Sequence, residues 1–167
     1  MNIENLANIT IKQAEEKGWG AHPEEIIVSE KIALIHSEIS EAYDAYQNNN
    51  MNGKDGFFEE LSDVLIRTVH LAKIFNLTME VADVTFPSDI SAQIAALHKI
   101  TSDAFENYRH KKEDEFAKCL SHLINALIKC SKIYEFDLEK EALKKIGCND
   151  SRTWDKNKLN EQLFKTK

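Results

Sequence analysis

An apolar spacing of three or four residues persists along most of the chain and constrains the fold more than any other feature. It is clearest in the run Ile32, Ile35, Ile39, Ala42 and Tyr46, whose side chains share one face of an α-helix. Two prolines and five glycines in 167 residues are too few for a β-sandwich or a disordered linker. At roughly 150 residues per domain, we predict a single all-α domain with a substantial core.

The same spacing predicts helices that are separated by short polar turns. The first helix spans 3–16, the second follows Pro23 and runs through Tyr46, and the third runs from Phe57 to Phe75. The asparagine-rich segment 48–53 supplies the turn between the two long helices. We expect a short turn of helix at 78–84, further helices at 88–109, 113–134 and 137–146, and an irregular or weakly helical end.

The two long helical hairpins resemble each other in sequence. Residues 32–36 match 94–98, residues 42–46 match 104–108, and residues 73–75 match 132–134. His, Tyr and Lys positions match as well as apolar ones, which favours a duplication over two unrelated amphipathic hairpins. We therefore predict a four-helix-bundle core built from repeat 1 (about 24–84) and repeat 2 (about 88–146), with an N-terminal helix, a short C-terminal helix and a basic tail at 147–167.

Charge is distributed unevenly along the chain. The net charge is −7, yet residues 24–63 hold ten acids and two bases (−8), whereas residues 144–167 hold three acids and seven bases (+4). The acidic total argues against a duplex nucleic-acid partner, which requires a basic surface. Three cysteines without disulfide spacing, a polar N-terminus and no long apolar stretch predict a cytoplasmic protein with no membrane partner.

Four acids form the most specific pattern: Glu38 and Glu41 on one predicted helix, and Glu60 and Asp63 on the next. Each pair is spaced i, i+3, so both carboxylates project from one helical face. In an antiparallel hairpin centred on the asparagine-rich turn, the two pairs face each other. A solvated acidic face is the ordinary alternative, but apolar neighbours place these acids at the seam, where a divalent cation such as Mg²⁺ relieves their repulsion. Glu59 is expected to face outward.

The second hairpin lacks this set of acids. Its corresponding residues are Ile100, Asp103, Cys119 and His122, so we expect no second Mg²⁺ site there. Three residues without a fourth ligand make a poor transition-metal site, and we expect His122 to be buried and hydrogen-bonded.

The Glu-x-x-Glu and Glu-x-x-Asp pair resembles the motif of the MazG-type all-α nucleoside triphosphate pyrophosphohydrolases, a superfamily that includes dimeric dUTPases. Residues 31–42 and 15–19 are similar to that family as well. A third similar element lies near the C-terminus and consists of Lys145, Asn149, Arg152, Trp154 and Lys158. The resemblance thus covers most of the chain, in three separate motifs.

The resemblance implies hydrolysis of a (deoxy)nucleoside triphosphate to the monophosphate and pyrophosphate, in nucleotide-pool house-cleaning. Mg²⁺, with Mn²⁺ as a substitute, is then held by the four acids, and Glu38 or Glu41 serves as the general base. The implied substrate contacts are Lys145, Asn149 and Arg152 for phosphates, Trp19 and Trp154 for base or sugar, and Lys158.

Family members with a single hairpin pair as dimers, so the internal repeat implies an intramolecular pseudo-dimer, which leaves further pairing into a homodimer open. The rival interpretation is a non-catalytic nucleotide-binding protein, or a helical scaffold or regulator. A di-iron bundle is excluded because no histidine follows a glutamate at the required spacing. The chain also has no glycine-rich phosphate loop.

Overall fold

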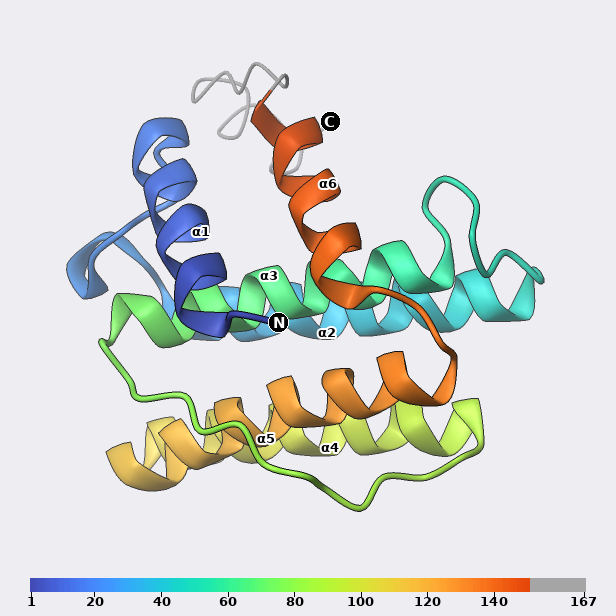
Figure 1. The fold of residues 1–167 in the computed structure, drawn as a ribbon. Helices are drawn as coiled ribbons and strands as arrows, with labels where there is room; N and C mark the ends of the chain where they lie inside the picture. The colour runs from blue at the N-terminus through green and yellow to red at the C-terminus, as the bar shows by residue number, and fades with distance from the viewer. Residues whose placement is uncertain (151–167) are drawn as a thin grey trace, which may run out of the picture.

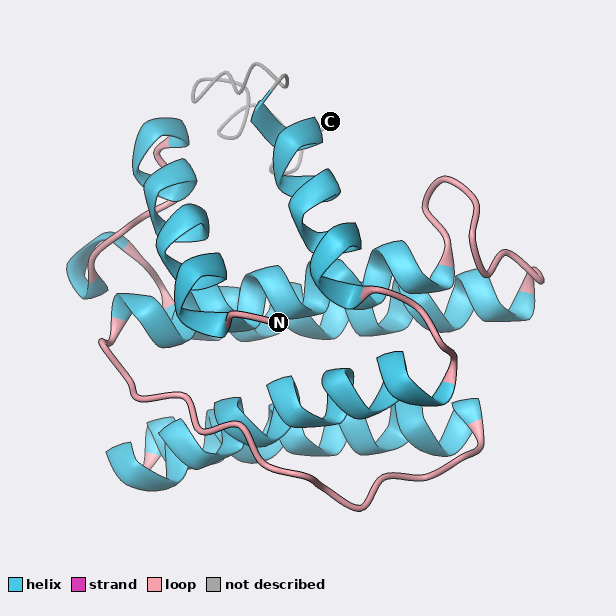
Figure 2. Ribbon diagram, viewed as in Figure 1, coloured by secondary structure: helices cyan, strands magenta, loops and turns pink. Residues whose placement is uncertain are grey.

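The computed structural model describes residues 1–150, and within them every regular element is a helix (Figure 2). The elements are α1 (Ile3–Lys17), a short 3-10 turn (Pro23–Glu25), α2 (Val28–Gln47), α3 (Phe57–Ile74), α4 (Ile90–Arg109), α5 (Glu113–Ile133) and α6 (Leu138–Asp150). The all-α prediction is confirmed. Among these residues, no helix is both long and apolar enough to cross a membrane.

Two antiparallel hairpins form the centre of the molecule. The α2–α3 hairpin packs on the α4–α5 hairpin, while α1 and α6 stand on the opposite side of α3 (Figure 1). The apolar stripes of the four long helices meet between the hairpins and are fully buried there; they include Ile35, Ile39, Leu61, Leu65, Leu97, Leu123 and Leu127. This is the four-helix core that amphipathic periodicity predicts.

Matching residues of the two repeats meet where α2 packs against α4. The Nδ1 atoms of His36 and His98, 62 positions apart in the chain, lie 2.7 Å from each other. Their rings stack with centroids 5.0 Å apart. Contact between equivalent residues is what a two-fold axis between duplicated hairpins produces.

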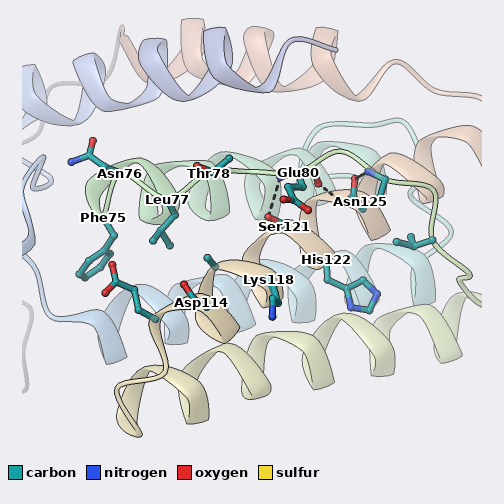
Figure 3. A pocket seen from close by; sticks show the side chains of 14 residues that line it. Phe75, Asn76, Leu77, Thr78, Glu80, Asp114, Lys118, Ser121, His122 and Asn125 are labelled. Atoms are coloured by element: carbon teal, nitrogen blue, oxygen red, sulfur yellow. Dashed lines mark hydrogen bonds between the residues drawn. The ribbon is translucent and has the colours of Figure 1, made fainter.

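The segment between the two hairpins differs from the prediction. Residues 78–84 contain no helix and instead run as an extended strap across α5 (Figure 1). The Asn125 side chain accepts a hydrogen bond from the Ala82 amide at 3.0 Å and donates one to the Glu80 carbonyl at 2.8 Å. The Ser121 hydroxyl accepts a third bond, from the Glu80 amide, at 3.3 Å. These contacts (Figure 3) satisfy backbone groups that a helix would have paired internally.

The C-terminal helix is longer than expected. A helix was predicted at 137–146, but α6 continues to Asp150 and so includes the first residues of the segment called the basic tail. Gln13 of α1 donates a hydrogen bond to the Ile146 carbonyl at 2.8 Å, and Lys17 donates one to the Asp150 carbonyl at 2.8 Å. These bonds fix α6 beside α1.

Candidate metal centre

Three carboxylates from α2 and α3 converge inside the first hairpin. Oxygen atoms of Glu38, Glu60 and Asp63 all lie within 4.8 Å of one another. Glu38 is only 6% exposed and Glu60 only 3% exposed, which is rare for acids without a compensating partner. This arrangement has the ligand type and spacing that suit a hard divalent cation.

The local sequence explains why these acids are buried. Glu38 shares its helix face with Ile35, Ile39 and Ala42, all of them fully buried. Glu60 and Asp63 lie one turn apart on α3, among equally buried apolar side chains. Packing of the apolar stripe therefore carries the acids into the seam, at a cost in desolvation that cation binding would offset.

Burial and mutual repulsion change the acidity of the cluster. Burial, together with the charges of Asp63 and Glu38 and against the opposing charge of Lys145, raises the pKa of Glu60 to about 8. Burial likewise raises the pKa of Asp63 to about 6, although Lys145 opposes the shift. At neutral pH Glu60 therefore keeps its proton, and the carboxylates of Glu38 and Asp63 are paired with Arg67 and Lys145.

Lys145 of α6 reaches into this cluster from the opposite layer. Its ammonium lies 2.8 Å from an oxygen of Asp63 and 2.9 Å from an oxygen of Glu59, and its side chain is 10% exposed. Burial acts to lower the pKa of Lys145, but the two carboxylates outweigh it and the pKa is raised. The residue expected to contact phosphate is therefore brought to the acids, where it is paired with carboxylates.

Arg67 is a site residue that the sequence interpretation missed. Its Nε donates to Glu38 Oε1 at 2.6 Å, and its Nη2 contacts the same oxygen. Arg67 follows Asp63 by four residues and Glu60 by seven, so helical spacing alone places all three on one face of α3. That spacing could have identified it.

Two further acids occupy places that the sequence did not predict. Glu41 is exposed, and its carboxylate accepts a hydrogen bond from the Ser37 hydroxyl at 3.1 Å, so the structure brings together three of the four predicted ligands. Glu59, expected to face outward, is 17% exposed in its side chain and bound to Lys145. Its other oxygen accepts the Asp55 amide at 3.1 Å.

A turn between α1 and α2 lies at the other end of the cluster. The Lys31 ammonium donates to the Trp19 carbonyl at 2.7 Å, and His70 Nε2 bonds the Gly20 carbonyl at 2.8 Å. A carbonyl can only accept, so Nε2 carries the proton. Gly20 has φ +88°, a conformation that L side chains rarely adopt, and an added Cβ would lie 2.4 Å from Ile26. The glycine thus permits the turn that holds the half-buried Trp19 near α3.

Of the remaining predicted substrate residues, one lies within residues 1–150 and three lie outside them. Asn149 is half-buried on α6, one turn beyond Lys145. Arg152, Trp154 and Lys158 lie outside the described residues. Two cavities of about 550 and 280 Å³ are lined by residues of the strap, α5 and α1, and neither is lined by the three acids (Figure 3).

The second hairpin holds no comparable group of ligands within residues 1–150. Asp103 is paired with Lys99 at 2.6 Å, and the Cys119 thiol accepts a bond from Asn107 at 3.5 Å. His122 is exposed at the edge of the strap cavity (Figure 3), so the expectation that it is buried was wrong. The position projects outward from α5, and within residues 1–150 no helix covers its ring in the way that α6 covers Asp63.

Comparison of the chain with protein-family models, curated proteins and solved structures gave no significant match.

Proposed function

We propose that this protein hydrolyses a (deoxy)nucleoside triphosphate to the monophosphate and pyrophosphate, using Mg²⁺ held by Glu38, Glu60 and Asp63. The observation that carries the proposal is the convergence of these three carboxylates within 4.8 Å at a seam of buried apolar side chains, where Arg67 and Lys145 also reach them. Structural packing alone gives no reason to gather three acids in one buried place, because each of them costs desolvation. A divalent ion that also bridges phosphate oxygens does give one.

Each residue has a role in the proposed reaction. Bound Mg²⁺ would neutralise the phosphate chain and favour attack on it. Water forms a bond to the α-phosphorus, the bond from that phosphorus to the bridging oxygen breaks, and pyrophosphate leaves. Glu41, one turn from Glu38 and outside the ligand group, takes the proton of the attacking water. Glu38, proposed from the resemblance as a base, acts here as a ligand.

Substrate binding is assigned to the residues around the cluster. Lys145 and Asn149, one turn apart on α6, serve the phosphate oxygens, and Trp19 serves the base or sugar. Arg152, Trp154 and Lys158 are proposed for the same contacts on the strength of the resemblance. We further propose that the protein acts in the cytoplasm on free nucleotides, as a house-cleaning enzyme, with Mn²⁺ able to replace Mg²⁺.

The direct experiment is a panel of canonical and damaged ribo- and deoxyribonucleoside triphosphates, assayed for pyrophosphate with and without Mg²⁺. The proposal predicts release from at least one member, dependent on the metal and accompanied by the monophosphate. Release of inorganic phosphate in place of pyrophosphate contradicts the assigned bond cleavage. A panel with no turnover contradicts the enzyme assignment.

One observation favours the non-catalytic alternative. Arg67 and Lys145 already pair with Glu38 and Asp63, so the acids are partly satisfied by the protein itself, as in a helical scaffold or a nucleotide-binding regulator. Calorimetric titration with Mg²⁺ and a non-hydrolysable triphosphate separates these possibilities. A scaffold binds neither, a regulator binds both without turnover, and the enzyme binds both and releases pyrophosphate from the hydrolysable form.

A further inference from the structure

Positive charge collects on one flank of the acidic cluster, toward the turn that carries Trp19. Arg67 reaches Glu38 from one turn beyond Asp63 on α3. Lys31 lies in the first turn of α2 and is anchored on the Trp19 carbonyl. Burial is the main cause that lowers the pKa of Lys31. The nearby charge of Glu30 opposes this shift, and the nearby charge of Arg67 adds to it. Within residues 1–150, Arg67 is paired with the single acid Glu38, and Lys31 is bonded to a neutral carbonyl.

We propose that Arg67 and Lys31 form an anion subsite beside the three acids, and that this subsite takes the phosphate groups that leave as pyrophosphate. The proposal rests on the proposed function, because it supplies the ligand class. Nothing in the motif resemblance assigns either residue a role.

The geometry of Arg67 suits an exchange of partners. Only its Nε and one terminal nitrogen face Glu38, and its side chain is 37% exposed, so the rest of the guanidinium remains available to a ligand from solvent. A guanidinium presents five donors in a planar fork that matches phosphate oxygens. A metal ion bound to Glu38 would compete with Arg67 for that carboxylate. The guanidinium would then be free to bind a phosphate oxygen.

Lys31 contributes a second, fixed charge. Its bond to the Trp19 carbonyl uses one of three ammonium donors and restrains a side chain that is otherwise costly to order. The same bond holds the turn of Trp19 next to the subsite. On the opposite side of the acids, Lys145 is held by Glu59 and Asp63, so the phosphate chain would lie between cations at both ends of the cluster.

The experiment measures binding of inorganic pyrophosphate in the presence of saturating Mg²⁺ by calorimetry, with the full-length chain. Arg67→Gln and Lys31→Gln are each expected to weaken this binding by at least about tenfold, as is typical of lost charge-assisted hydrogen bonds. Binding of Mg²⁺ alone should be unchanged or tighter, because a competing cation has been removed. Arg109→Gln is the matched control, since Arg109 forms an exposed pair with Glu106 at the far end of α4.

The outcomes separate this inference from the proposed function. The subsite is overturned if both variants bind pyrophosphate with wild-type affinity. If the wild-type chain also turns over a triphosphate, the proposed function is unaffected by that result. Pyrophosphate binding that depends on Arg67, in a chain that turns over no nucleotide, supports the subsite and overturns the enzyme assignment. If Arg67→Gln does not fold, Arg67→Lys keeps the charge but loses the fork, and wild-type affinity in both Arg67→Lys and Lys31→Gln likewise overturns the subsite.

Discussion

The Lys145 ammonium lies 2.8 Å from Asp63 and 2.9 Å from Glu59, so a single lysine of α6 is paired with two acids of α3. This contact joins the C-terminal layer of the molecule to the candidate metal centre. It also places a positive charge beside the carboxylates that we propose as metal ligands. The protein therefore carries, in its own chain, a partial substitute for a bound cation.

Removal of this lysine should leave Asp63 and Glu59 without their partner. Lys145→Met is expected to lower the free energy of unfolding by about 3 kcal/mol, because breaking one side of a buried ion pair strands the other. Added Mg²⁺ should restore part of this loss and raise the melting temperature more in the variant than in the wild type. Denaturant unfolding with and without Mg²⁺ measures both effects.

Lys144→Met is the matched control for that substitution. Lys144 is exposed and pairs with Glu141 at 3.2 Å on the surface of the same helix, and we expect a change within about 0.5 kcal/mol. Equal losses in the two variants would show that the contact of Lys145 with the cluster contributes no special stability.

His70 should make stability fall as the solution becomes acidic. Burial, with the nearby charges of Lys31 and Arg67 and despite the bond to Gly20, lowers its pKa from 6.5 to about 4. The contribution of His70 to the free energy of unfolding is fully present above pH 6.5 and is lost as the pH falls toward 4. Over this range the imidazole becomes protonated in the unfolded chain but stays neutral in the folded chain. Between pH 7.5 and 5 this amounts to about 2 kcal/mol.

The measurement is the difference in unfolding free energy between those two pH values, in wild type and in His70→Gln. The variant should lose about 2 kcal/mol less on acidification, and the difference between the chains removes the opposing contributions of other groups. His110→Gln, which replaces an exposed imidazole, should retain the wild-type slope. A wild-type slope in His70→Gln contradicts the assignment.

The contact between His36 and His98 should couple the two hairpins energetically. A double-mutant cycle with alanine at both positions is expected to give a coupling energy of about 1 kcal/mol, the usual net value of a partly buried hydrogen bond. His36→Ala combined with His122→Ala should be additive, since His122 is exposed on another helix. Additivity in the first cycle as well would mean that the pair contributes nothing across this interface.

Asn125 should determine whether the strap stays attached to α5. Asn125→Ala removes its bonds to the Ala82 amide and the Glu80 carbonyl. It is expected to cost about 1–3 kcal/mol and to speed hydrogen exchange at the Ala82 amide. Asn107→Ala, which removes a bond to the Cys119 thiol away from the strap, is the control. Unchanged exchange at the Ala82 amide would contradict the attachment.

The sequence predicted most of the helices because apolar periodicity is a local signal. It placed the ends of α1 to α5 within a few residues. It also put four acids at the hairpin seam, of which three converge there and Glu41 does not. It also aligned His36 with His98. Their contact could have been predicted by assuming that the two hairpins pack about a two-fold axis. The burial of Glu38 and Glu60 follows from apolar neighbours that the sequence displays.

The errors arose where distant side chains determine the structure. The strap is rich enough in helix formers to suggest a short helix, but Asn125 and Ser121 of α5 bind its backbone, and no local pattern contains that information. Likewise, the outward placement expected for Glu59 ignored Lys145, which is 86 positions away. The bonds of Gln13 and Lys17 to carbonyls of α6 likewise join residues 133 positions apart.

The most direct test of the account is Mg²⁺-dependent release of pyrophosphate from a triphosphate by the wild-type chain and by Glu60→Gln. Glutamine keeps the volume of this buried side chain but cannot ionise to hold a cation, so the variant should fold at least as well. The account predicts pyrophosphate release by the wild type and a loss of about 100-fold or more in the variant, with Glu106→Gln at the wild-type rate. Equal rates in wild type and Glu60→Gln, or no pyrophosphate from any triphosphate, would contradict it.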